Sequence, residues 1–589
     1  MTLFSKVLVA NRGEIAVRVF RTLRDMGLDS VAVYSDVDRS AMHPRYADEA
    51  YALGGSTSAE TYLVVEKVLA AARRAGAGAI HPGYGFLAEN AAFARAVEEA
   101  GLVWIGPPPA AIELMGSKTR ARQAMRAAGV PIIPGTTEPV GSADEVVALG
   151  DEIGYPLLIK AAAGGGGKGM KTVHSAEEAA QAFASAQREG RSYFADSSVY
   201  VEKYLEDPRH VEVQVLADAH GNVIHLGERD CTMQRRHQKL IEETPSPAVG
   251  HELRGRIGKI AVDAAHAAGY RSAGTIEGLL TRDGSYYFME MNTRIQVEHP
   301  ITEVVAGVDI VRAQIQVALG ERLQFSQDEI RLQGHAIECR INAEDPSNGF
   351  LPSPGVITAY REPSGPGVRV DSGVALGSEV SPLYDPMIAK LVVRGADRED
   401  AIGRMLRALE EFEIGGVKTL IGFHKALLSH PCFRAGETCE GVVESAELAA
   451  RAAELAEEPV RGRGADGGAA GPAGRQELTT TAEVDGRRVT VKVLVPEPPH
   501  RDLARRRNER ARAGAGSGGT GAVVSPMQGT VLEVKVADGD PVEPGQVICV
   551  VEAMKMENEV VAHGAGVIAD LAVSPGQPVT NGQLICSIR

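Results

Sequence analysis

The sequence predicts a multidomain protein of mixed α/β and α+β type that ends in a small all-β domain. The chain has 589 residues, whereas a single domain usually holds about 100–200 residues. A strand–helix–strand pattern opens the chain, which favours an α/β domain. Two similar stretches with short predicted strands, Gly529–Glu552 and Gly566–Arg589, close it.

The N-terminal region, residues 1–115, predicts a parallel sheet covered by helices. An apolar run at residues 6–10 predicts the first strand. Ile15, Val19 and Leu23 then recur every four residues, so they share one face of a helix. A second strand, SVAVYS, follows at residues 30–35, and the alternation continues to about residue 115. The segment NRGE after the first strand is not the glycine pattern of a dinucleotide site.

The middle of the chain, residues 116–330 and 331–447, predicts α+β structure. VYVEKYL, HVEVQVLAD, VIHLGERDC and SYYFMEMN are strand-like, with stretches that alternate apolar and polar side chains. A helix is predicted around Arg398–Phe412. Residues 448–521 are rich in Ala, Glu, Gly and Arg, which predicts a linker. Within it, Asp485-Gly486 between two alternating runs predicts a β-hairpin at residues 478–495.

The last domain, residues 522–589, contains an internal repeat and displays one lysine. Nine of 24 positions are identical between its two copies. Each copy predicts two short strands around a turn, and two such units bury their apolar sides by packing face to face. Lys555 lies in the crossing between the copies, flanked by Met554 and Met556. The lysine is either an attachment point at a protruding turn or an ordinary surface lysine beside two gap-filling methionines.

Residues 160–171, KAAAGGGGKGMK, predict a phosphate-binding loop. Gly164–Gly167 carry no Cβ, so their N–H groups can approach a phosphate closely. Lys160, Lys168 and Lys171 supply positive charge. The spacing is not that of a P-loop. A flexible linker is the alternative, and the strands predicted on both sides argue against it.

An acidic cluster is predicted on a hairpin that begins near residue 275. Glu277 and Glu290 fall on neighbouring antiparallel strands joined by a turn near Asp283-Gly284. Asn292 lies on the same face as Glu290, because side chains alternate along a strand. Such oxygen ligands, together with phosphate oxygens, suit Mg²⁺.

The same alternation continues through Arg294, Gln296 and Glu298. If this segment is extended, a cation, an amide and a carboxylate lie in a row beside the metal. An arginine can bind a small oxyanion, and a neighbouring glutamate can act as its base. The alternative is an ordinary polar face of a strand.

Composition excludes several classes of protein. The net charge of −15 disfavours non-specific binding to nucleic acid or acidic membranes. No apolar run approaches the ~20 residues of a membrane span, and the N-terminus shows no secretory signal. The six cysteines form no C-x-x-C pair, so we expect neither a zinc site nor a disulfide framework, and a cytoplasmic location.

Eight stretches of the first ~450 residues, in order, resemble the biotin carboxylase component of acyl-CoA carboxylases, an ATP-grasp enzyme. They are VANRGEIAVR, IHPGYGFLAEN, MGSK, KAAAGGGGKGM, VEKYLEDPRHVEVQV, ERDCTMQRRHQKLIEE, EMNTRIQVEHPITE and ECRINAEDP. The EAMKMEN segment around Lys555 resembles the biotinyl carrier domain, a flattened β-sandwich of the biotinyl/lipoyl type. Together they resemble the fused α subunit of a bacterial acetyl- or propionyl-CoA carboxylase.

The resemblance divides the chain into a biotin carboxylase N-terminal domain (1–115), an ATP-grasp domain (116–330), a biotin carboxylase C-terminal domain (331–447), the linker (448–521) and the carrier (522–589). It also implies a nucleotide site. The residues that match nucleotide-binding positions are Lys118, Lys160, Gly165, Gly166, Gly167, Glu202, His210, Gln234, His237, Glu277 and Glu290. For either histidine alone, a buried structural role is the better expectation.

Further positions match the catalytic centre of the family. The implied magnesium or manganese ligands are Glu277, Glu290 and Asn292, and the implied bicarbonate ligands are Arg294, Gln296 and Val297. Lys239 matches a lysine near the γ-phosphate, Glu298 the general base, Arg340 the arginine that stabilises the biotin enolate, and Lys555 the biotin attachment site. One departure is Gly278, where the family commonly has a bulky aromatic residue.

The implied function is ATP- and bicarbonate-dependent carboxylation of biotin on Lys555 through carboxyphosphate, with ATP as substrate. The implied partners are further copies of the chain, a biotin protein ligase and a separate carboxyltransferase β subunit, with or without a small accessory subunit. The final acyl acceptor stays open. Two alternatives are an ATP-grasp ligase of the carbamoyl-phosphate or purine type, and a scaffold subunit whose ATP site has decayed. The carrier argues against the first, and the full set of site residues argues against the second.

Overall fold

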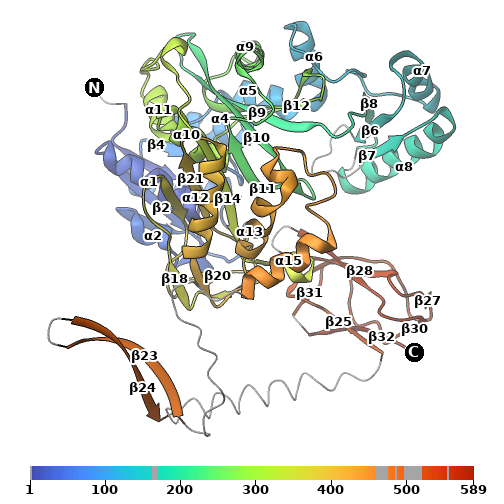
Figure 1. The fold of residues 1–589 in the computed structure, drawn as a ribbon. Helices are drawn as coiled ribbons and strands as arrows, with labels where there is room; N and C mark the ends of the chain where they lie inside the picture. Colours follow the sequence, from blue (N-terminus) through green and yellow to red (C-terminus); the bar gives the residue numbers. More distant parts are fainter. Residues whose placement is uncertain are drawn as a thin grey trace. The chain divides into compact units, whose positions relative to one another are not determined.

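A computed structural model of the chain describes residues 3–161, 170–194, 196–457, 475–484, 487–496, 521–553, 556–580 and 582–589 (Figure 1). Its contacts divide the chain into two units, Met1–Glu458 and Pro459–Arg589, which are described separately. The first unit holds three sheets relevant to the site.

The first sheet confirms the parallel α/β domain predicted for the N-terminus. Its five strands lie in the order β3-β2-β1-β4-β5, all parallel. They are β1 (Lys6–Val9), β2 (Asp29–Tyr34), β3 (Glu49–Ala52), β4 (Ala79–His81) and β5 (Val103–Trp104). Helix α1 (Gly13–Asp25) buries the predicted face of Ile15, Val19 and Leu23 completely. The other helices of this region are α2 (Met42–Tyr46), α3 (Val65–Ala75), α4 (Ala91–Glu99) and α5 (Pro109–Gly116).

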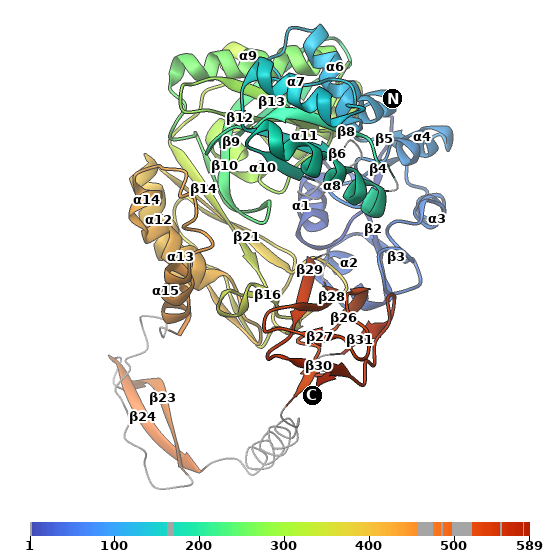
Figure 2. The ribbon, with the colours of Figure 1, turned by 90° about the vertical axis from the view of Figure 1, so that its right-hand side faces the viewer.

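An antiparallel sheet of eight strands (Figure 2) carries seven of the predicted site residues, namely His210, Gln234, Lys239, Glu277, Glu290, Asn292 and Arg340. Its order is β13-β12-β9-β10-β11-β14-β21-β19. The strands are β9 (Arg209–Ala217), β10 (Val223–Arg235), β11 (Gln238–Thr244), β12 (Ser272–Leu280), β13 (Tyr286–Asn292), β14 (His335–Asn342), β19 (Val368–Ser372) and β21 (Met387–Gly395). One continuous sheet therefore crosses the expected domain border at residue 330. Helix α10 (His299–Ala306) packs on it through Ile301 and Val305, against Ala336 and Val392.

A smaller sheet of three strands confirms the strands predicted on both sides of the glycine run. Its order is β7-β6-β8, with β6 (Leu157–Ala161), β7 (Met170–Val173) and β8 (Val199–Lys203). Helices α7 (Ala143–Ile153) and α8 (Ala176–Phe194) accompany it, and Val146, Ala179 and Phe183 share a core with its strands. Gly165, Gly166 and Gly167 lie outside the described residues. The helices α6 (Lys118–Ala127), α9 (His251–Ala267) and α11 (Ile310–Ala318) complete this part of the chain.

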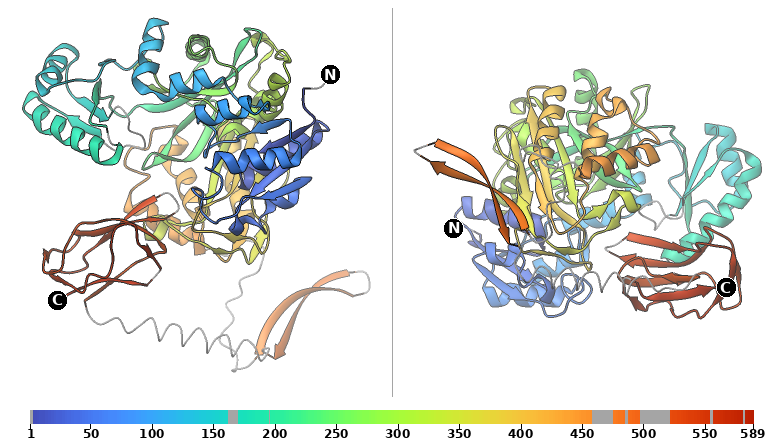
Figure 3. Two further views of the ribbon diagram at one scale, coloured as in Figure 1. Left: turned by 180° about the vertical axis from the view of Figure 1, so that it is seen from behind. Right: turned by 60° about the horizontal axis from the view of Figure 1, so that its bottom comes forward.

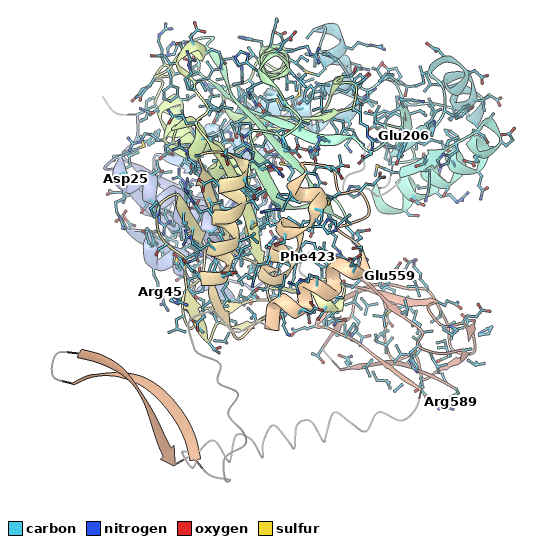
Figure 4. The ribbon with its side chains drawn as sticks, viewed as in Figure 1. Asp25, Arg45, Glu206, Phe423, Glu559 and Arg589 are labelled. Carbon is cyan, nitrogen blue, oxygen red and sulfur yellow. A yellow bond between two sulfur atoms is a disulfide. The ribbon has the colours of Figure 1, made fainter. Side chains whose placement is uncertain are left out.

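The predicted linker begins too early, because its first ten residues are helical. The structure places α12 (Arg398–Glu411) as predicted, followed by α13 (Ile421–Ser429), α14 (Pro431–Arg434) and α15 (Ala446–Glu457). Leu448 and Ala452 of α15 are buried. A Cβ placed on Gly422 of α13 would clash with the carbonyl oxygen of Ala452, so the two helices approach at a glycine. Phe423 of α13, labelled in Figure 4, packs edge-on against Phe350, with the two ring centroids 5.0 Å apart.

The cysteines form one bridge among the described residues, which is not the disulfide framework that the sequence argues against. Cys432 and Cys439 form a disulfide, with Cα atoms 5.6 Å apart. The seven-residue separation of these cysteines does not by itself predict a bridge. A bridge also requires that the intervening loop bring the two Cα atoms close together. The remaining cysteines are free and buried, namely Cys231, Cys339, Cys549 and Cys586.

The second unit confirms the β-hairpin, formed by β23 (Arg475–Val484) and β24 (Arg487–Pro496). Asp485 and Gly486 lie outside the described residues. The unit also holds two four-stranded sheets, drawn in red in Figure 3. The first has the order β25-β32-β30-β27 and the second β29-β28-β26-β31. Their strands are β25 (Ala522–Val524), β26 (Gly529–Val534), β27 (Pro541–Val542), β28 (Val547–Ala553), β29 (Met556–Val561), β30 (Gly566–Ala569), β31 (Pro578–Val579) and β32 (Leu584–Ile588).

The two repeats are interleaved, rather than packed as two separate units. Each copy contributes three strands instead of the two expected. β27 of the first copy pairs with β30 of the second, and β31 of the second copy pairs with β26 of the first. Each sheet therefore needs a strand from the other repeat. Neither copy can bury its apolar side alone, which is the physical reason that the repeat occurs as a pair.

Candidate active site

The site is built around Lys239 of β11, whose ammonium group donates three hydrogen bonds. It contacts Glu212 of β9 at 2.5 Å, Glu277 of β12 at 3.0 Å and Glu298 at 2.6 Å. Burial alone would lower the pKa of Lys239, but the three carboxylates outweigh it and raise the pKa well above its usual value. Lys239 therefore stays charged and joins three segments of the chain.

Strand register explains why the acidic residues meet. Glu212, Glu277 and Glu290 stand directly opposite one another on β9, β12 and β13. The predicted pairing of Glu277 with Glu290 is confirmed. Like charges at opposed positions destabilise a sheet, so this row needs cations beside it. His210 Nε2 also lies 3.0 Å from Glu277.

Glu298 lies at the N-terminal end of α10 and is buried. Its Oε1 accepts from Lys239, and its Oε2 accepts from Arg340 Nη2 at 2.9 Å. Burial tends to raise the pKa of this carboxyl, but Lys239, Arg340 and Arg229 lower it below the usual value despite Glu212 nearby. Glu298 is therefore an ionised carboxylate held between two cations.

The predicted extended row from Asn292 to Glu298 is wrong. β13 ends at Asn292, the chain bends at Arg294, and a turn at residues 297–298 leads into α10. The side chains still converge, since Gln296 Nε2 donates to Glu277 at 2.6 Å. Convergence here comes from the turn and from partners on other strands, not from alternation along one strand.

Arg340 of β14 is fixed on two sides. Its Nε donates to Glu242 of β11 at 2.6 Å, and its Nη2 donates to Glu298. Its own backbone carbonyl lies 2.7 Å from His424 Nε2. A guanidinium presents several donors in a rigid plane, so these bonds set its orientation. The structure thus places Arg340 beside the expected general base.

Arg229 of β10 is a residue of the site that sequence reasoning missed. It is fully buried and makes five hydrogen bonds. Its acceptors are Glu212 (2.6 Å), Gln214 (2.8 Å), Thr302 (2.9 Å), Thr275 (3.2 Å) and Gln296 (2.6 Å). The sequence gives no clear signal for it, because its strand reads VIHLGERDCTMQR and carries several other charged and polar residues.

Two carboxylates fit the implied metal. Burial and the neighbouring Glu277 raise the pKa of Glu290. A cation bound between the two carboxylates would offset their mutual repulsion. Asn292 fits less well. Its amide nitrogen donates to Glu277 at 2.7 Å, and its oxygen accepts from Arg294 Nη2 at 3.0 Å. Its oxygen would have to leave Arg294 to reach a metal ion.

The expected bicarbonate ligands share further contacts. Arg294 Nε donates to Glu89 Oε2 at 2.9 Å, and Glu89 Oε1 accepts from the Thr293 N–H at 2.9 Å. Glu89 belongs to the loop HPGYGFLAEN, so the N-terminal domain helps to hold Arg294. The sequence offers no role for Glu89, because its partner is 205 positions away. The carbonyl of Val297 accepts from Lys390 Nζ at 3.0 Å.

The nucleotide residues form a second cluster. Lys160 of β6 and Glu202 of β8 form an ion pair of 2.5 Å, and Arg122 also contacts Glu202. Burial lowers the pKa of Lys118, with Lys160 adding to the effect and the carboxylates of Glu290 and Glu202 opposing it. Lys118 is therefore affected by charged groups of two sheets, namely Lys160 and Glu202 of the small sheet and Glu290 of β13.

Of the remaining predicted residues, Gln234 Nε2 lies 2.5 Å from His210 Nδ1. His237 does not join the cluster. It is exposed at the turn between β10 and β11, where both Arg236 (φ 47°) and His237 (φ 64°) are left-handed. A buried structural role therefore does not apply to His237.

The expected biotin attachment site, Lys555, lies outside the described residues. β28 and β29 pair in antiparallel register up to Ala553 opposite Met556. In the sequence, two residues separate these paired ends, and Lys555 is the second. Glu559 of β29 is exposed and is labelled in Figure 4.

Four family models match the chain. "Biotin carboxylase, N-terminal domain" matches residues 3–112, and "Carbamoyl-phosphate synthase L chain, ATP binding domain" matches residues 117–326. "Biotin carboxylase C-terminal domain" matches residues 338–445, and "Biotin-requiring enzyme" matches residues 521–588. The four matches follow one another in the order of the regions described above.

Individual proteins resemble the chain over most of its length. A pyruvate carboxylase subunit of Methanothermobacter thermautotrophicus is 56% identical over 435 residues, which are 74% of this chain and 88% of that protein. The biotin-dependent acyl-coenzyme A carboxylase alpha3 subunit of Mycobacterium leprae is 48% identical over 570 residues, 95% of this chain and 94% of that protein. The biotin carboxylase domain of Hydrogenobacter thermophilus 2-oxoglutarate carboxylase, solved with MgADP and bicarbonate, is 48% identical with a TM-score of 0.71, covering 76% of this chain and 100% of that one.

Among the helices that the structure describes, none is long and apolar enough to span a bilayer.

Proposed function

Because this chain belongs to the biotin carboxylase family, whose members carboxylate biotin with ATP, we propose that Lys239, Glu298 and Arg340 form the catalytic centre of that reaction. The chain is an ATP-dependent ligase with a biotinyl domain on the same polypeptide. The observation that supports the assignment is the position of Glu298, a buried carboxylate held between a lysine and an arginine.

Glu298 is proposed as the base that takes the proton of bicarbonate. A carboxylate with a lowered pKa is ionised at neutral pH and so is ready to accept a proton. Each of its oxygens accepts one hydrogen bond, from Lys239 or Arg340, and keeps a lone pair that can accept a further hydrogen bond. Lys239 and Arg294 offset the negative charge that gathers as phosphate is transferred, and positioning and charge dominate such reactions.

Glu277 and Glu290 would hold the magnesium ion, which supplies positive charge to the phosphates of ATP when bound. Lys118 and Lys160 are proposed phosphate ligands, together with the glycine loop Gly165–Gly167. Since Lys160 is paired with Glu202 here, nucleotide binding must exchange that partner for a phosphate.

The biotin ring is the substrate of this centre and supplies the nitrogen that receives the carboxyl group. Arg340 is proposed to hold the negative charge that develops on the ring oxygen. It stands beside Glu298 and is oriented by Glu242. Lys555 is proposed as the attachment point, since the matched biotinyl region includes it.

We propose that the carboxylated carrier serves a separate carboxyltransferase subunit that acts on an acyl-CoA. The relative named for acyl-coenzyme A carboxylation matches 95% of the chain, carrier included. A keto acid such as pyruvate is a second candidate, because the relative named for pyruvate is 56% identical over 74% of the chain. The hairpin β23–β24 is a proposed docking element for the carboxyltransferase. A cytoplasmic location is also proposed, since the single bridge Cys432–Cys439 is not a disulfide framework.

For the domain borders we propose 1–115, 116–330 and 331–457, with the third extended to the end of α15. Residues 458–521 then form the linker, and 522–589 the carrier.

Two measurements test the assignment. Intact-mass analysis after co-expression with a biotin ligase should show one biotinyl group on the wild type and none on Lys555→Arg. Glu298→Gln should keep ATP binding but lower bicarbonate-dependent ATP hydrolysis by about 10²–10⁴-fold, the usual contribution of a general base. Hydrolysis at the wild-type rate in Glu298→Gln would contradict the role of Glu298.

A further inference from the structure

Lys390 of β21 is a buried lysine to which neither the sequence nor the family match assigns a role. Its side chain has no exposed surface. It stands opposite Arg340 in the register of β14 and β21, so the two side chains lie on the same face of the sheet. A buried ammonium group is costly unless something compensates its charge, so its presence here needs a reason.

The acidic groups near Lys390 do not form a close ion pair with it. The nearest carboxylate oxygen is Glu14 Oε1 at 3.9 Å, and burial raises the pKa of Glu14. Burial also raises the pKa of Glu338 well above its usual value, with Glu242 adding to the effect. Asp371 lies opposite Lys390 on β19, but its Oδ2 forms an ion pair with Arg369 Nη2 at 2.7 Å.

What Lys390 does contact is the turn that carries the proposed base. Within the described part of the chain, its Nζ donates one hydrogen bond, to the carbonyl of Val297 at 3.0 Å. That carbonyl belongs to the peptide unit whose nitrogen is the backbone nitrogen of Glu298. Orienting this peptide therefore orients the Cα from which the Glu298 carboxylate projects.

We propose that Lys390 is a positioning residue of the carboxylation reaction, which fixes the Val297–Glu298 peptide and thereby aims Glu298 at bicarbonate. The inference rests on the proposed role of Glu298. A charged donor makes a stronger hydrogen bond than a neutral one, which accounts for a lysine at this place. The bond also links β21 of the C-terminal region to a turn of the ATP-binding region.

The test uses the full biotinylated chain and compares Lys390→Met with Lys390→Arg. Methionine is unbranched and only one heavy atom shorter than lysine, and it removes the charge and the donor, whereas arginine keeps both. Loss of alignment by about 1 Å costs up to ~10²-fold, so we expect Lys390→Met to raise the KM for bicarbonate and lower kcat/KM for bicarbonate by about 10–100-fold. The KM for ATP should change less than about twofold, and Lys390→Arg should recover most of the loss.

Arg394→Met is the matched control. Arg394 lies on the same strand and also donates to a backbone carbonyl, that of Gln333 at 2.9 Å, remote from the site. It should leave both KM values unchanged. Thermal unfolding verifies that each variant is folded, and Lys390→Leu, which also lacks a charge and a donor, replaces Lys390→Met if the latter does not fold.

The inference is overturned if the folded neutral variant keeps the wild-type kcat/KM for bicarbonate, or if the KM for ATP rises by the same factor as kcat/KM for bicarbonate falls. Failure of the proposed function looks different. In that case the wild type itself shows no ATP hydrolysis that depends on bicarbonate and biotin, or Glu298→Gln matches the wild type.

Discussion

At the scale of single residues, the centre of the site depends on buried charges that pair with one another. Arg229 and Lys239 together reach Glu212, Glu277, Glu298 and Gln296. Removing one partner of such a network leaves an uncompensated buried charge, which usually costs about 3–5 kcal/mol. The catalytic residues are therefore also structural residues, and stability must be measured alongside activity in any variant.

Glu242 gives a prediction on pH at this scale. Burial raises its pKa to about 7, although Arg340 opposes the rise. The folded state then binds a proton that the unfolded chain releases above the ordinary carboxyl pKa, so the free energy of unfolding falls as the pH rises through the window up to about 7. We expect Glu242→Gln to remove this fall, which amounts to at most ~1.4 kcal/mol per pH unit. Denaturant unfolding at several pH values between 5 and 8 measures it.

Glu243, the next residue of β11, is the control, because its pKa is shifted in the opposite direction to that of Glu242. Burial tends to raise its pKa, but hydrogen bonds from His335 and Arg398 outweigh this and lower it. Its carboxylate therefore stabilises the fold above the unfolded pKa, and that stability is lost as the pH falls through the folded pKa. Glu243→Gln should be destabilised most at neutral pH. Equal pH profiles for the two variants would contradict the assignment of these groups.

At the scale of elements, the composition of residues 448–457 wrongly predicted a linker, whereas the structure has helix α15 there. Alanine and glutamate also suit an exposed linker, so composition alone could not identify a packed helix. Leu448 and Ala452 bury one side of it against α13. The close approach is permitted by Gly422, because any side chain there would meet the backbone of Ala452.

A glycine substitution tests this packing. Gly422→Ala should separate the helices and lower the free energy of unfolding by about 1–3 kcal/mol, as overpacking usually does. Hydrogen exchange should then show faster exchange in residues 446–457 than in the wild type.

Gly403→Ala in α12 is its control, since a Cβ there meets nothing within 4 Å. It should be neutral or stabilising by up to ~1 kcal/mol, because alanine favours helix more than glycine. A neutral Gly422→Ala would show that α15 is not packed through this residue.

At the scale of the whole molecule, the two units have separate cores. In the second unit, Val531, Ile548, Val551 and Ile585 are fully buried, and the first unit contains every described residue of the catalytic cluster. Because the biotinyl domain belongs to the same polypeptide, we expect covalent attachment to raise the local concentration of this substrate.

Separating the units tests that view. A chain that ends at residue 458 should fold and hydrolyse ATP in a reaction that depends on bicarbonate and free biotin. Its KM for free biotin should lie far above the concentration of chain in the assay, because covalent attachment of a substrate gives an effective concentration of about 1 mM. Steady-state kinetics of the shortened and full chains measure the difference. A shortened chain that is unfolded, or that is inactive at saturating biotin, would contradict the independence of the first unit.

The sequence by itself determined the local features of this protein. Alternation and helical periodicity gave the strands and α1, and the spacing of Glu277 and Glu290 around a turn gave their pairing, because these depend on residues near in sequence. Motifs around Lys239, Glu298 and Arg340 identified the site for the same reason. Only the tertiary structure decided which distant residues complete it. Arg229, Glu89 and Lys390 contact partners on other elements of the chain, the two repeats exchange strands, and one sheet crosses a domain border. Those features depend on which strands pair and in what register, and such long-range contacts leave no fixed spacing in the sequence.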